Sequence, residues 1–104
     1  MYGRLVEIEG MDPSKRNEVA GIIRERIIPS MKEIDGFIGF IALMDEQTQR
    51  ARSVVLWETK ESAEEAERQF ASRREEVVRN AGGKVQSADL YEAPIVEVQT
   101  GVRA

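Results

Sequence analysis

Hydrophobic residues follow two different periods along the chain, and the change of period divides the sequence into strands and helices. Some segments alternate apolar and polar residues or are apolar throughout, which is typical of strands. Such segments lie at residues 2–9, 37–44, 51–58 and 84–92. In the two longer intervals between them, apolar residues recur every three or four positions, which predicts a helix in each interval.

The first predicted helix has a clear beginning and an interruption. Asp12 can cap it and Pro13 suits its first turn, where a missing N–H is harmless. Pro29 should kink the helix or divide it into a long and a short piece. Asp35 and Gly36 form a plausible stop signal. The expected apolar positions are Val19, Ile22, Ile23, Ile27, Met31 and Ile34.

The second predicted helix has two alternative N-caps, Thr59 and Ser62, and Ser62 with Glu65 has the spacing of a capping box. Residues 80–83, Asn-Ala-Gly-Gly, form a strong stop signal. The expected buried stripe consists of Ala63, Ala66, Phe70, Val77 and Ala81.

The predicted order of elements is β-α-β-β-α-β. Two βαβ halves give an α+β, ferredoxin-like sandwich, in which two helices cover one face of a four-stranded antiparallel sheet. Residues 1–94 form this domain. Pro94 introduces a C-terminal tail over 95–104, and its alternation over 95–100 predicts a short extra strand that contacts the sheet of a partner subunit.

The uncovered face of this sheet presents a problem for a monomer. The strand over 37–44 carries large apolar residues on both faces, with Phe37, Ile41 and Leu43 on one and Ile38, Phe40 and Met44 on the other. One set would remain exposed, and exposed apolar patches usually mark interfaces. We therefore expect a homodimer that packs through the sheet face. The alternative is an edge strand partly covered by the tail.

Composition limits the chemistry and the partners. The 104 residues include 15 Lys and Arg, 19 Asp and Glu, and neither cysteine nor histidine. A net charge of −4 weighs against nucleic acid, and no apolar run is long enough to span a membrane. We expect a cytoplasmic protein with no bound metal, because neither thiolates nor imidazoles are available and the carboxylates show no metal-binding spacing.

Three short segments resemble the antibiotic biosynthesis monooxygenase (ABM) family. They are Ile-Asp-Gly-Phe-Ile-Gly at 34–39, Val-Val-Leu-Trp-Glu-Thr at 54–59 and Leu-Tyr-Glu at 90–92, and the similarity runs over residues 2–92. The resemblance implies a ferredoxin-like fold that pairs into a dimeric α/β barrel, with a ligand cleft between sheet and helices. Members of the family and their relatives include cofactor-free oxygenases of polycyclic phenols and haem-degrading oxygenases.

The residues that haem-degrading relatives use are mostly absent. Their tryptophan matches Trp57, but their first-strand asparagine falls on Gly3 and their histidine on Glu67. We therefore expect no haem degradation. Phenol-oxidising relatives bind the substrate and stabilise its anion with tryptophan, asparagine, tyrosine and arginine, and the chain retains Trp57, Tyr91 and several arginines.

Two residues are candidates for catalysis. Trp57 ends a strand and can stack on a flat aromatic ligand or simply fill the core. Glu7 shares a strand face with Leu5. If that face points to the helices, burial would make the Glu7 carboxylate a base for a phenol. The alternative is a glutamate paired across strands with Arg4 or Arg52.

The expected ligand-binding set is Trp57, Phe70, Tyr91 and Arg4. Each also has a purely structural interpretation, in packing or in ion pairing. The alternating Glu and Arg residues at 64–79 indicate a solvated, salt-bridged helix surface.

Two functions are compatible with these features. One is a monooxygenase without a cofactor that acts on a flat phenolic molecule, since a phenolate can itself pass an electron to oxygen. The other is a non-catalytic dimeric protein that binds a small ligand or has an accessory role. The fold alone does not choose between them.

Overall fold

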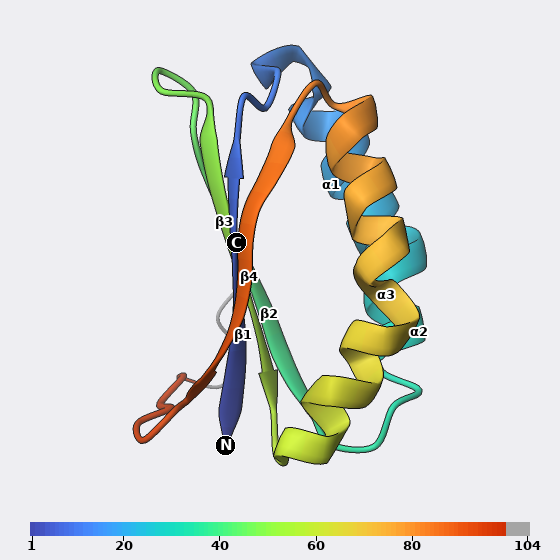
Figure 1. The fold of residues 1–104 in the computed structure, drawn as a ribbon, viewed down its shortest axis with the longest axis vertical. Helices are drawn as coiled ribbons and strands as arrows, with labels where there is room; N and C mark the ends of the chain where they lie inside the picture. Colours follow the sequence, from blue (N-terminus) through green and yellow to red (C-terminus); the bar gives the residue numbers. More distant parts are fainter. Residues whose placement is uncertain (100–104) are drawn as a thin grey trace.

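The computed structural model describes residues 1–99 and contains one sheet and one helical layer (Figure 1). In chain order the elements are β1 (Tyr2–Glu9), the 3-10 helix η1 (Pro13–Lys15), α1 (Arg16–Ile22), the π-helix η2 (Ile23–Ile27), α2 (Ile28–Met31), β2 (Phe37–Asp45), β3 (Arg50–Trp57), α3 (Lys60–Asn80) and β4 (Lys84–Glu92).

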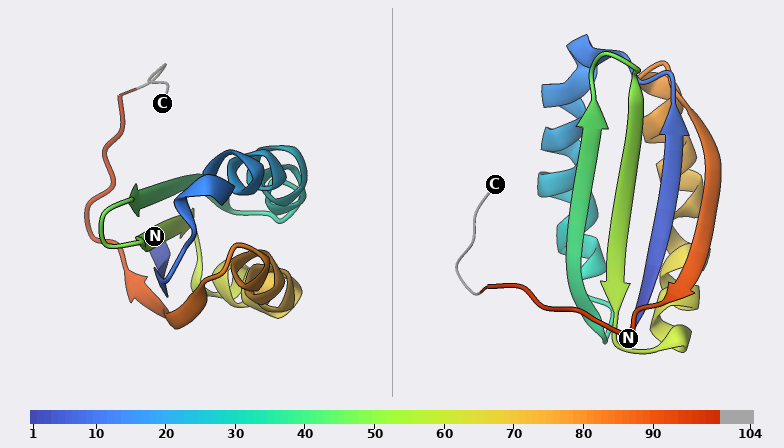
Figure 2. Two further views of the ribbon diagram at one scale, coloured as in Figure 1. Left: turned by 90° about the horizontal axis from the view of Figure 1, so that it is seen from above. Right: turned by 90° about the vertical axis from the view of Figure 1, so that its left-hand side faces the viewer.

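The four strands form an antiparallel sheet in the order β2-β3-β1-β4. All helices cover the same face, and the opposite face, which we call the open face, carries none (Figure 2). The predicted order of elements and the ferredoxin-like arrangement are therefore confirmed. The two central strands, β3 and β1, come from different βαβ halves of the chain. Because β1 pairs with both strands of the second half, β3 and β4, it joins the two halves.

The four segments from η1 to α2, which we call the first helical limb, occupy residues 13–31. Asp12 caps its start by accepting a hydrogen bond from the Ser14 N–H at 2.9 Å. Just before Pro29 the period widens to a π-helix, and the Ile28 N–H bonds back to the Ile23 carbonyl. Pro29 has no N–H to donate to a carbonyl of the preceding turn. The helix accommodates it through the π-helical turn η2, in place of the predicted kink or division.

The second limb is the single helix α3. Of the two proposed caps, Thr59 is the N-cap and accepts a hydrogen bond from the Ser62 N–H at 3.1 Å. Ser62 instead donates from its hydroxyl to the Asp35 carbonyl at 2.6 Å, which ties α3 to the turn before β2. The helix ends as predicted near the glycines, and Gly82 takes a φ of +82°.

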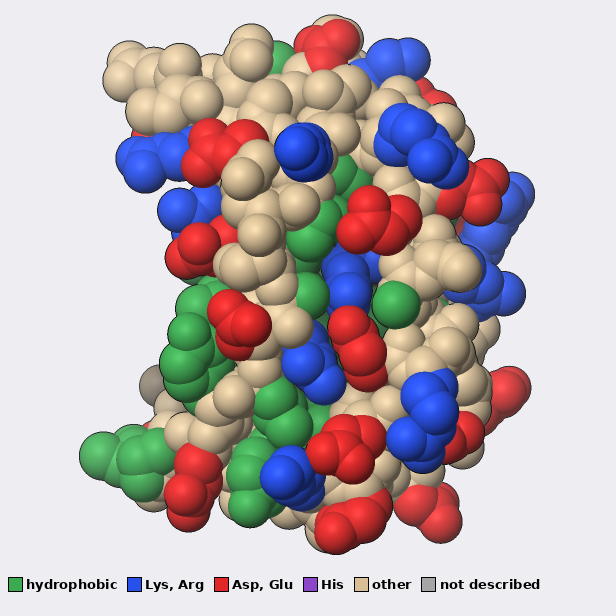
Figure 3. Space-filling model, in the orientation of Figure 1, with side chains coloured by type: hydrophobic (Ala, Val, Ile, Leu, Met, Phe, Trp, Pro, Cys, Tyr) green, Lys and Arg blue, Asp and Glu red, His purple; other side chains and the backbone are tan. Residues whose placement is uncertain are grey.

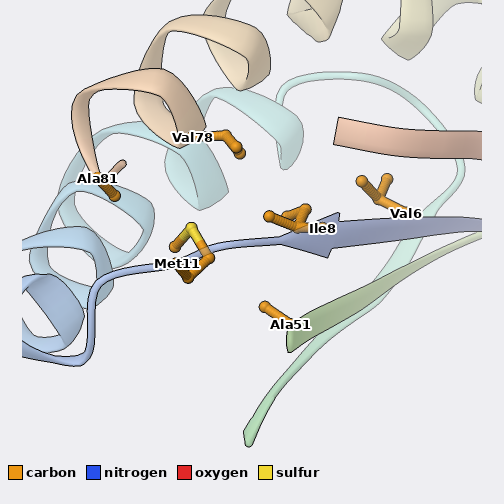
Figure 4. Close-up of a cluster of buried hydrophobic side chains, with 6 residues drawn as sticks. All are labelled: Val6, Ile8, Met11, Ala51, Val78 and Ala81. Atoms are coloured by element: carbon orange, nitrogen blue, oxygen red, sulfur yellow. The ribbon is translucent and has the colours of Figure 1, made fainter. Parts of the chain in front are cut away.

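The core lies between the sheet and the helices and has two parts. One consists of Val6, Ile8, Met11, Ala51, Val78 and Ala81, whose strand and helix side chains face each other in Figure 4. The other consists of Met31, Val55, Trp57, Ala63, Ala66 and Phe70. Near the end of α3 the buried valine is Val78, while Val77, which we expected in the buried stripe, remains half-buried.

Strand β2 does not follow a simple alternation. A register shift between Phe37 and Gly39 lets both Phe37 and Phe40 pack against the Trp57 part of the core. The predicted grouping of Phe37 with the residues on the other face is therefore wrong, because a bulge reverses the facing of the strand. Ile41 and Leu43 lie on the open face and are exposed.

The tail leaves the domain beyond β4. The Ala93 N–H donates to the Met1 carbonyl at 2.8 Å, and residues 95–99 form no strand. The rest of the expected strand, together with residues 101–104, lies outside the described part of the chain.

Candidate functional site

Trp57 is enclosed by other side chains. Its exposed fraction is 1%, and the Phe37 ring meets it edge-on, with 5.6 Å between ring centroids and an interplanar angle of 74°. Phe70, from the inner side of α3, belongs to the same cluster. In this conformation Trp57 packs β3 against the helical layer. The ring faces of Trp57, on which we expected a flat ligand to stack, are covered by other side chains.

Beside this aromatic group lies a partly buried cluster of charges, which we call the Arg4–Glu67–Arg74 cluster. Arg74 donates two hydrogen bonds to the two Glu67 carboxylate oxygens, both at 2.8 Å. The Arg4 Nε lies 3.8 Å from Glu67 Oε1, and Arg4 also donates from Nη1 to the Ala88 carbonyl. Figure 3 shows side chains of both charges filling the seam between β4 and α3.

The cluster holds two positive charges against one negative charge. The exposed fractions are 13% for the Arg4 side chain, 20% for Arg74 and 29% for Glu67. The hydrogen bonds from Arg74, opposed by burial, hold the pKa of Glu67 below its usual value, so Glu67 is ionised at neutral pH. Within residues 1–99, the buried Nε atoms of Arg4 and Arg74 have no hydrogen-bond acceptor. Both Nε–H groups are therefore unsatisfied donors within the seam.

Two grooves separate α3 from the first helical limb, on the side of α3 away from this seam. The α1–α3 groove has a volume of about 290 Å³ and is lined by Lys15, Glu18, Val19, Ile22, Arg26, Ile27, Arg73, Glu76, Val77, Asn80 and Ala81. The α2–α3 groove, of about 490 Å³, is lined by Ser30, Glu33, Ile34, Gln69, Phe70 and Arg73. Arg73 separates the two, with its guanidinium carbon 5.7 Å from the centre of the Phe70 ring.

Glu7 does not lie near Trp57. It faces Arg52 and Ser87 across its two neighbouring strands, with Arg52 Nε at 3.5 Å and a hydrogen bond from the Ser87 hydroxyl at 3.3 Å. Its neighbour Val6 points to the helices, so Glu7 points to the open face. The expectation of a carboxylate beside Trp57 is wrong, and the cross-strand pairing with Arg52 is what the structure contains.

Tyr91 and Gly3 also belong to the open face. They are paired across β1 and β4, and Tyr91 is 54% exposed. A Cβ on Gly3 would contact the side chains of Val54 and Leu56, which point away from Trp57. On β1, Arg4 is the residue that points toward α3, where it pairs with Glu67. Of the expected ligand-binding set, the structure brings together Arg4, Trp57 and Phe70, and it separates Tyr91 from them.

Sequence reasoning missed Arg74. The alternating charges of α3 were interpreted as a solvated surface, but Glu67 and Arg74 point inward beside Phe70. Their spacing is the available signal, because Phe70 lies three residues after Glu67 and four before Arg74, which places all three on one side of the helix.

Comparison with solved structures confirms the resemblance in fold. A monooxygenase from the gene ActVA-Orf6 of Streptomyces coelicolor, solved with nanaomycin D, is 12% identical with a TM-score of 0.69 over 95% of this chain and 92% of that one. SnoaB, a cofactor-independent oxygenase from Streptomyces nogalater solved as the N63A mutant, is 13% identical with a TM-score of 0.63 over 91% and 95%. The fold is thus that of the ferredoxin-like ABM monooxygenases.

A dimeric ferredoxin-like protein from an uncultured marine organism is also similar, at 8% identity, with a TM-score of 0.68 over 95% of this chain and all of that one. No protein-family model and no curated protein matches the sequence. At these identities the comparisons define the fold and leave the substrate to be argued from the site.

Two kinds of feature are absent from residues 1–99. No helix there is long and apolar enough to cross a membrane. No group of three or more acidic side chains gathers closely enough to hold a metal ion. The cytoplasmic location expected from the sequence stays a prediction.

Proposed function

We propose that this protein is an ABM-like, cofactor-independent monooxygenase that acts on a flat phenolic molecule bound at the seam between β4 and α3. The observation that carries the proposal is the Arg4–Glu67–Arg74 cluster. Two arginines that share one carboxylate, next to Phe70 and Trp57, offer cationic donors and aromatic faces to the same ligand. A phenolate has both matching parts, an anionic oxygen and a flat ring.

The chemistry requires only the ligand, dioxygen and an environment that favours the anion. Guanidinium groups near the phenol oxygen lower the pKa of its hydroxyl, and the proton passes to water. The phenolate then reduces dioxygen, and one oxygen atom forms a bond to a ring carbon. The O–O bond then breaks, and the ring carbon that has gained oxygen loses its hydrogen. The second oxygen atom leaves as water, made with that hydrogen and a proton from solvent, and the phenol becomes a quinone. Arg4 and Arg74 stabilise the anion, while Trp57 and Phe70 hold the ring.

Binding requires an opening of the seam, because Trp57 and Phe70 are packed in the structure described. The ligand anion would take the place of the Glu67 carboxylate on one of the two arginines. Such an exchange keeps the guanidinium groups paired throughout, which avoids a buried uncompensated charge.

The test is a panel of naphthols and polycyclic quinols, scored by quenching of Trp57 fluorescence and by oxygen uptake in metal-free buffer. Arg74→Gln should weaken binding about tenfold, as expected for loss of one charge-assisted contact. Arg68→Gln is the matched control, because Arg68 pairs with Glu65 on the exposed side of α3. Equal affinities for the phenols in Arg74→Gln and the native protein would contradict the proposal.

The second candidate function is a binding protein without catalysis. The position of Glu7 favours it, because the residue expected to act as a base lies on the open face and not beside Trp57. Ligands that quench Trp57 fluorescence and whose binding depends on Arg74, but that cause no oxygen uptake, would identify this function.

Glu7→Gln tests the hypothesis that Glu7 acts as a base. Unchanged ligand binding and unchanged turnover in this variant would eliminate the hypothesis.

The working unit that we propose is a homodimer packed through the open face. This face carries Leu43, 60% exposed, together with Ile41 and Tyr91, and a similar fold is dimeric. Leu43→Glu should shift the mass measured by light scattering toward the monomer, because it buries a charge at the interface. Ser72→Glu adds the same charge to the helical side and should leave the mass unchanged. A native protein that is monomeric at micromolar concentration would contradict the proposal.

A further inference from the structure

The first helical limb carries more apolar surface than the sheet covers. From η1 through η2 it contains no buried residue, although its sequence includes four large aliphatic side chains, Val19, Ile22, Ile23 and Ile27. Val19, Ile22 and Ile27 are half-buried and line the α1–α3 groove opposite Val77 of α3. Half-buried aliphatic residues that face a common groove form a floor that a further apolar group can cover.

The groove is large enough for a small molecule. Its volume of about 290 Å³ lies near the lower end of the range for ligand sites, which is about 300–1,000 Å³. Along α3 it extends from Arg73 to Ala81, a rise of about 12 Å at 1.5 Å per residue. That length suits an extended chain of about ten carbon atoms better than a compact ring system.

The charges around the groove are unbalanced toward positive. Lys15 and Glu18 pair with each other at 3.7 Å. The remaining charged side chains that line the groove are Arg26, Arg73 and Glu76, and within residues 1–99 none of them lies within 4.0 Å of an opposite charge. Two exposed arginines therefore flank an apolar floor with one carboxylate to oppose them.

The local backbone at the groove is unusual as well. Arg26 and Ile27 belong to the π-helix η2, and π-helical turns occur frequently at functional sites because they alter the direction of the side chains they carry. The groove lies between α1 and α3. Both helices lie on the side of the sheet opposite the open face (Figure 2). Pairing of two copies through that face would leave the groove accessible.

We propose that the α1–α3 groove binds an anionic amphiphile, a molecule with an aliphatic chain and one carboxylate. The chain covers Val19, Ile22, Ile27 and Val77, and the carboxylate pairs with Arg26 or Arg73. This site is separate from the seam between β4 and α3, because the two lie on opposite sides of α3. It does not depend on the proposed oxygenase activity.

The probe is decanoate, with decanol and decyltrimethylammonium as the neutral and cationic counterparts. Binding is followed by amide chemical-shift changes in α1, η2 and α3, with the dissociation constant obtained from titration. Arg26→Gln and Arg73→Gln should each weaken decanoate binding about five- to tenfold and leave decanol binding unchanged. Glu76→Gln should strengthen decanoate binding about threefold, since it removes the opposing charge.

Arg24→Gln is the matched control, because Arg24 is also an exposed arginine of η2 but does not line the groove. Three results would overturn the proposal: no shift changes in the groove with decanoate, equal weakening by Arg24→Gln, or equal affinity for the cationic probe. A change of oligomeric state in Arg26→Gln or Arg73→Gln would also overturn it, because a second copy of the chain would then occupy the groove. Weaker phenol binding by Arg74→Gln together with unchanged decanoate binding would show that the phenol and decanoate sites are separate.

Discussion

The two helical limbs cover the same face of the same sheet, but they pack on it differently. Helix α3 is regular over 21 residues and presents Ala63 and Ala66 to the sheet, so its backbone comes close and Phe70 is buried. The first helical limb changes period three times and presents β-branched residues that remain half-buried. Small side chains allow close approach, and bulky ones hold the limb at a distance. We infer that α3 stabilises the fold and that the first limb is available for a ligand.

The largest expected effect tests this difference directly. Phe70→Ala should lower the free energy of unfolding by about 3–5 kcal/mol, because it leaves a cavity in the core beside Trp57. Ile22→Ala, in the first limb, should lower it by only about 1 kcal/mol, since Ile22 is half-buried. Urea unfolding followed by circular dichroism measures both. Equal losses would show that the two limbs contribute equally to stability.

The junction between the limbs should be the next most sensitive point. Gly36 has a φ of +94°, and an added Cβ would approach the Ser62 hydroxyl oxygen to 2.7 Å. Gly36→Ala should therefore lower the free energy of unfolding by about 1–3 kcal/mol, from backbone strain and from the displaced hydrogen bond of Ser62. Gly39→Ala is the control, because an added Cβ there meets nothing within 4 Å. The same thermal melt on both variants decides the point, and equal losses would contradict it.

The charge cluster under α3 predicts a dependence on pH. Because the pKa of Glu67 in the folded protein is below its value of 4.5 in an unperturbed side chain, the ionised form stabilises the fold. This stabilisation is fully present above about pH 4.5 and is lost as the pH falls through the lower pKa of the folded state. Glu67→Gln should thus cost about 1 kcal/mol at pH 7 and progressively less below pH 4.5.

Glu75→Gln, on the exposed side of α3, removes the same formal charge and serves as the control. Chemical unfolding across pH 3 to 7 compares the two variants. A difference between Glu67→Gln and the native protein that does not change with pH would show that the carboxylate is not held by the arginines.

The smallest effect has the opposite sign and belongs to the first limb. Gly21 lies inside α1, and an added Cβ would meet nothing within 4 Å. Gly21→Ala should raise the free energy of unfolding by about 0.5–1 kcal/mol, because glycine is unfavourable inside a helix. Ala20→Gly should lower it by a similar amount. A destabilising Gly21→Ala, measured in the same melts, would show that close packing at this position had been overlooked.

Most of the fold could be predicted from the sequence, because strand patterns and helix caps depend on residues that are close together in the chain. Strands over 2–9 and 84–92 match β1 and β4, and Asp12, Thr59 and Gly82 mark ends of helices as their chemistry predicts. The bulge in β2 could not be predicted, since it depends on how Phe37 and Phe40 fit against Trp57. Nor could the π-helix, because Pro29 indicates an irregularity but not the form that it takes.

The candidate site was harder to predict because it depends on which face of a strand points to the helices. Gly3 matches a functional position of the haem-degrading relatives and shares its strand face with Glu7, which favours that face for the helical side. In the structure Arg4, on the other face of β1, points to the helices. A one-residue difference in register exchanges the two faces of a strand. Val6 and Ile8 form the strongly apolar pair on one face of β1, and this pair is the signal in the sequence that their face points to the core.

The position of β1 in the sheet has a consequence for the order of folding. The hairpin of β2 and β3 is local, but β1 pairs with β3 about fifty residues later and with β4 about eighty residues later. Loop closure over such distances is slow, so the central strand must wait for the end of the domain. Until β4 has paired, both the Arg4 side chain and the bonding edge of β1 face water. The Arg4–Glu67–Arg74 cluster, in which Arg4 also bonds to the Ala88 carbonyl of β4, is therefore complete only after β4 has paired with β1.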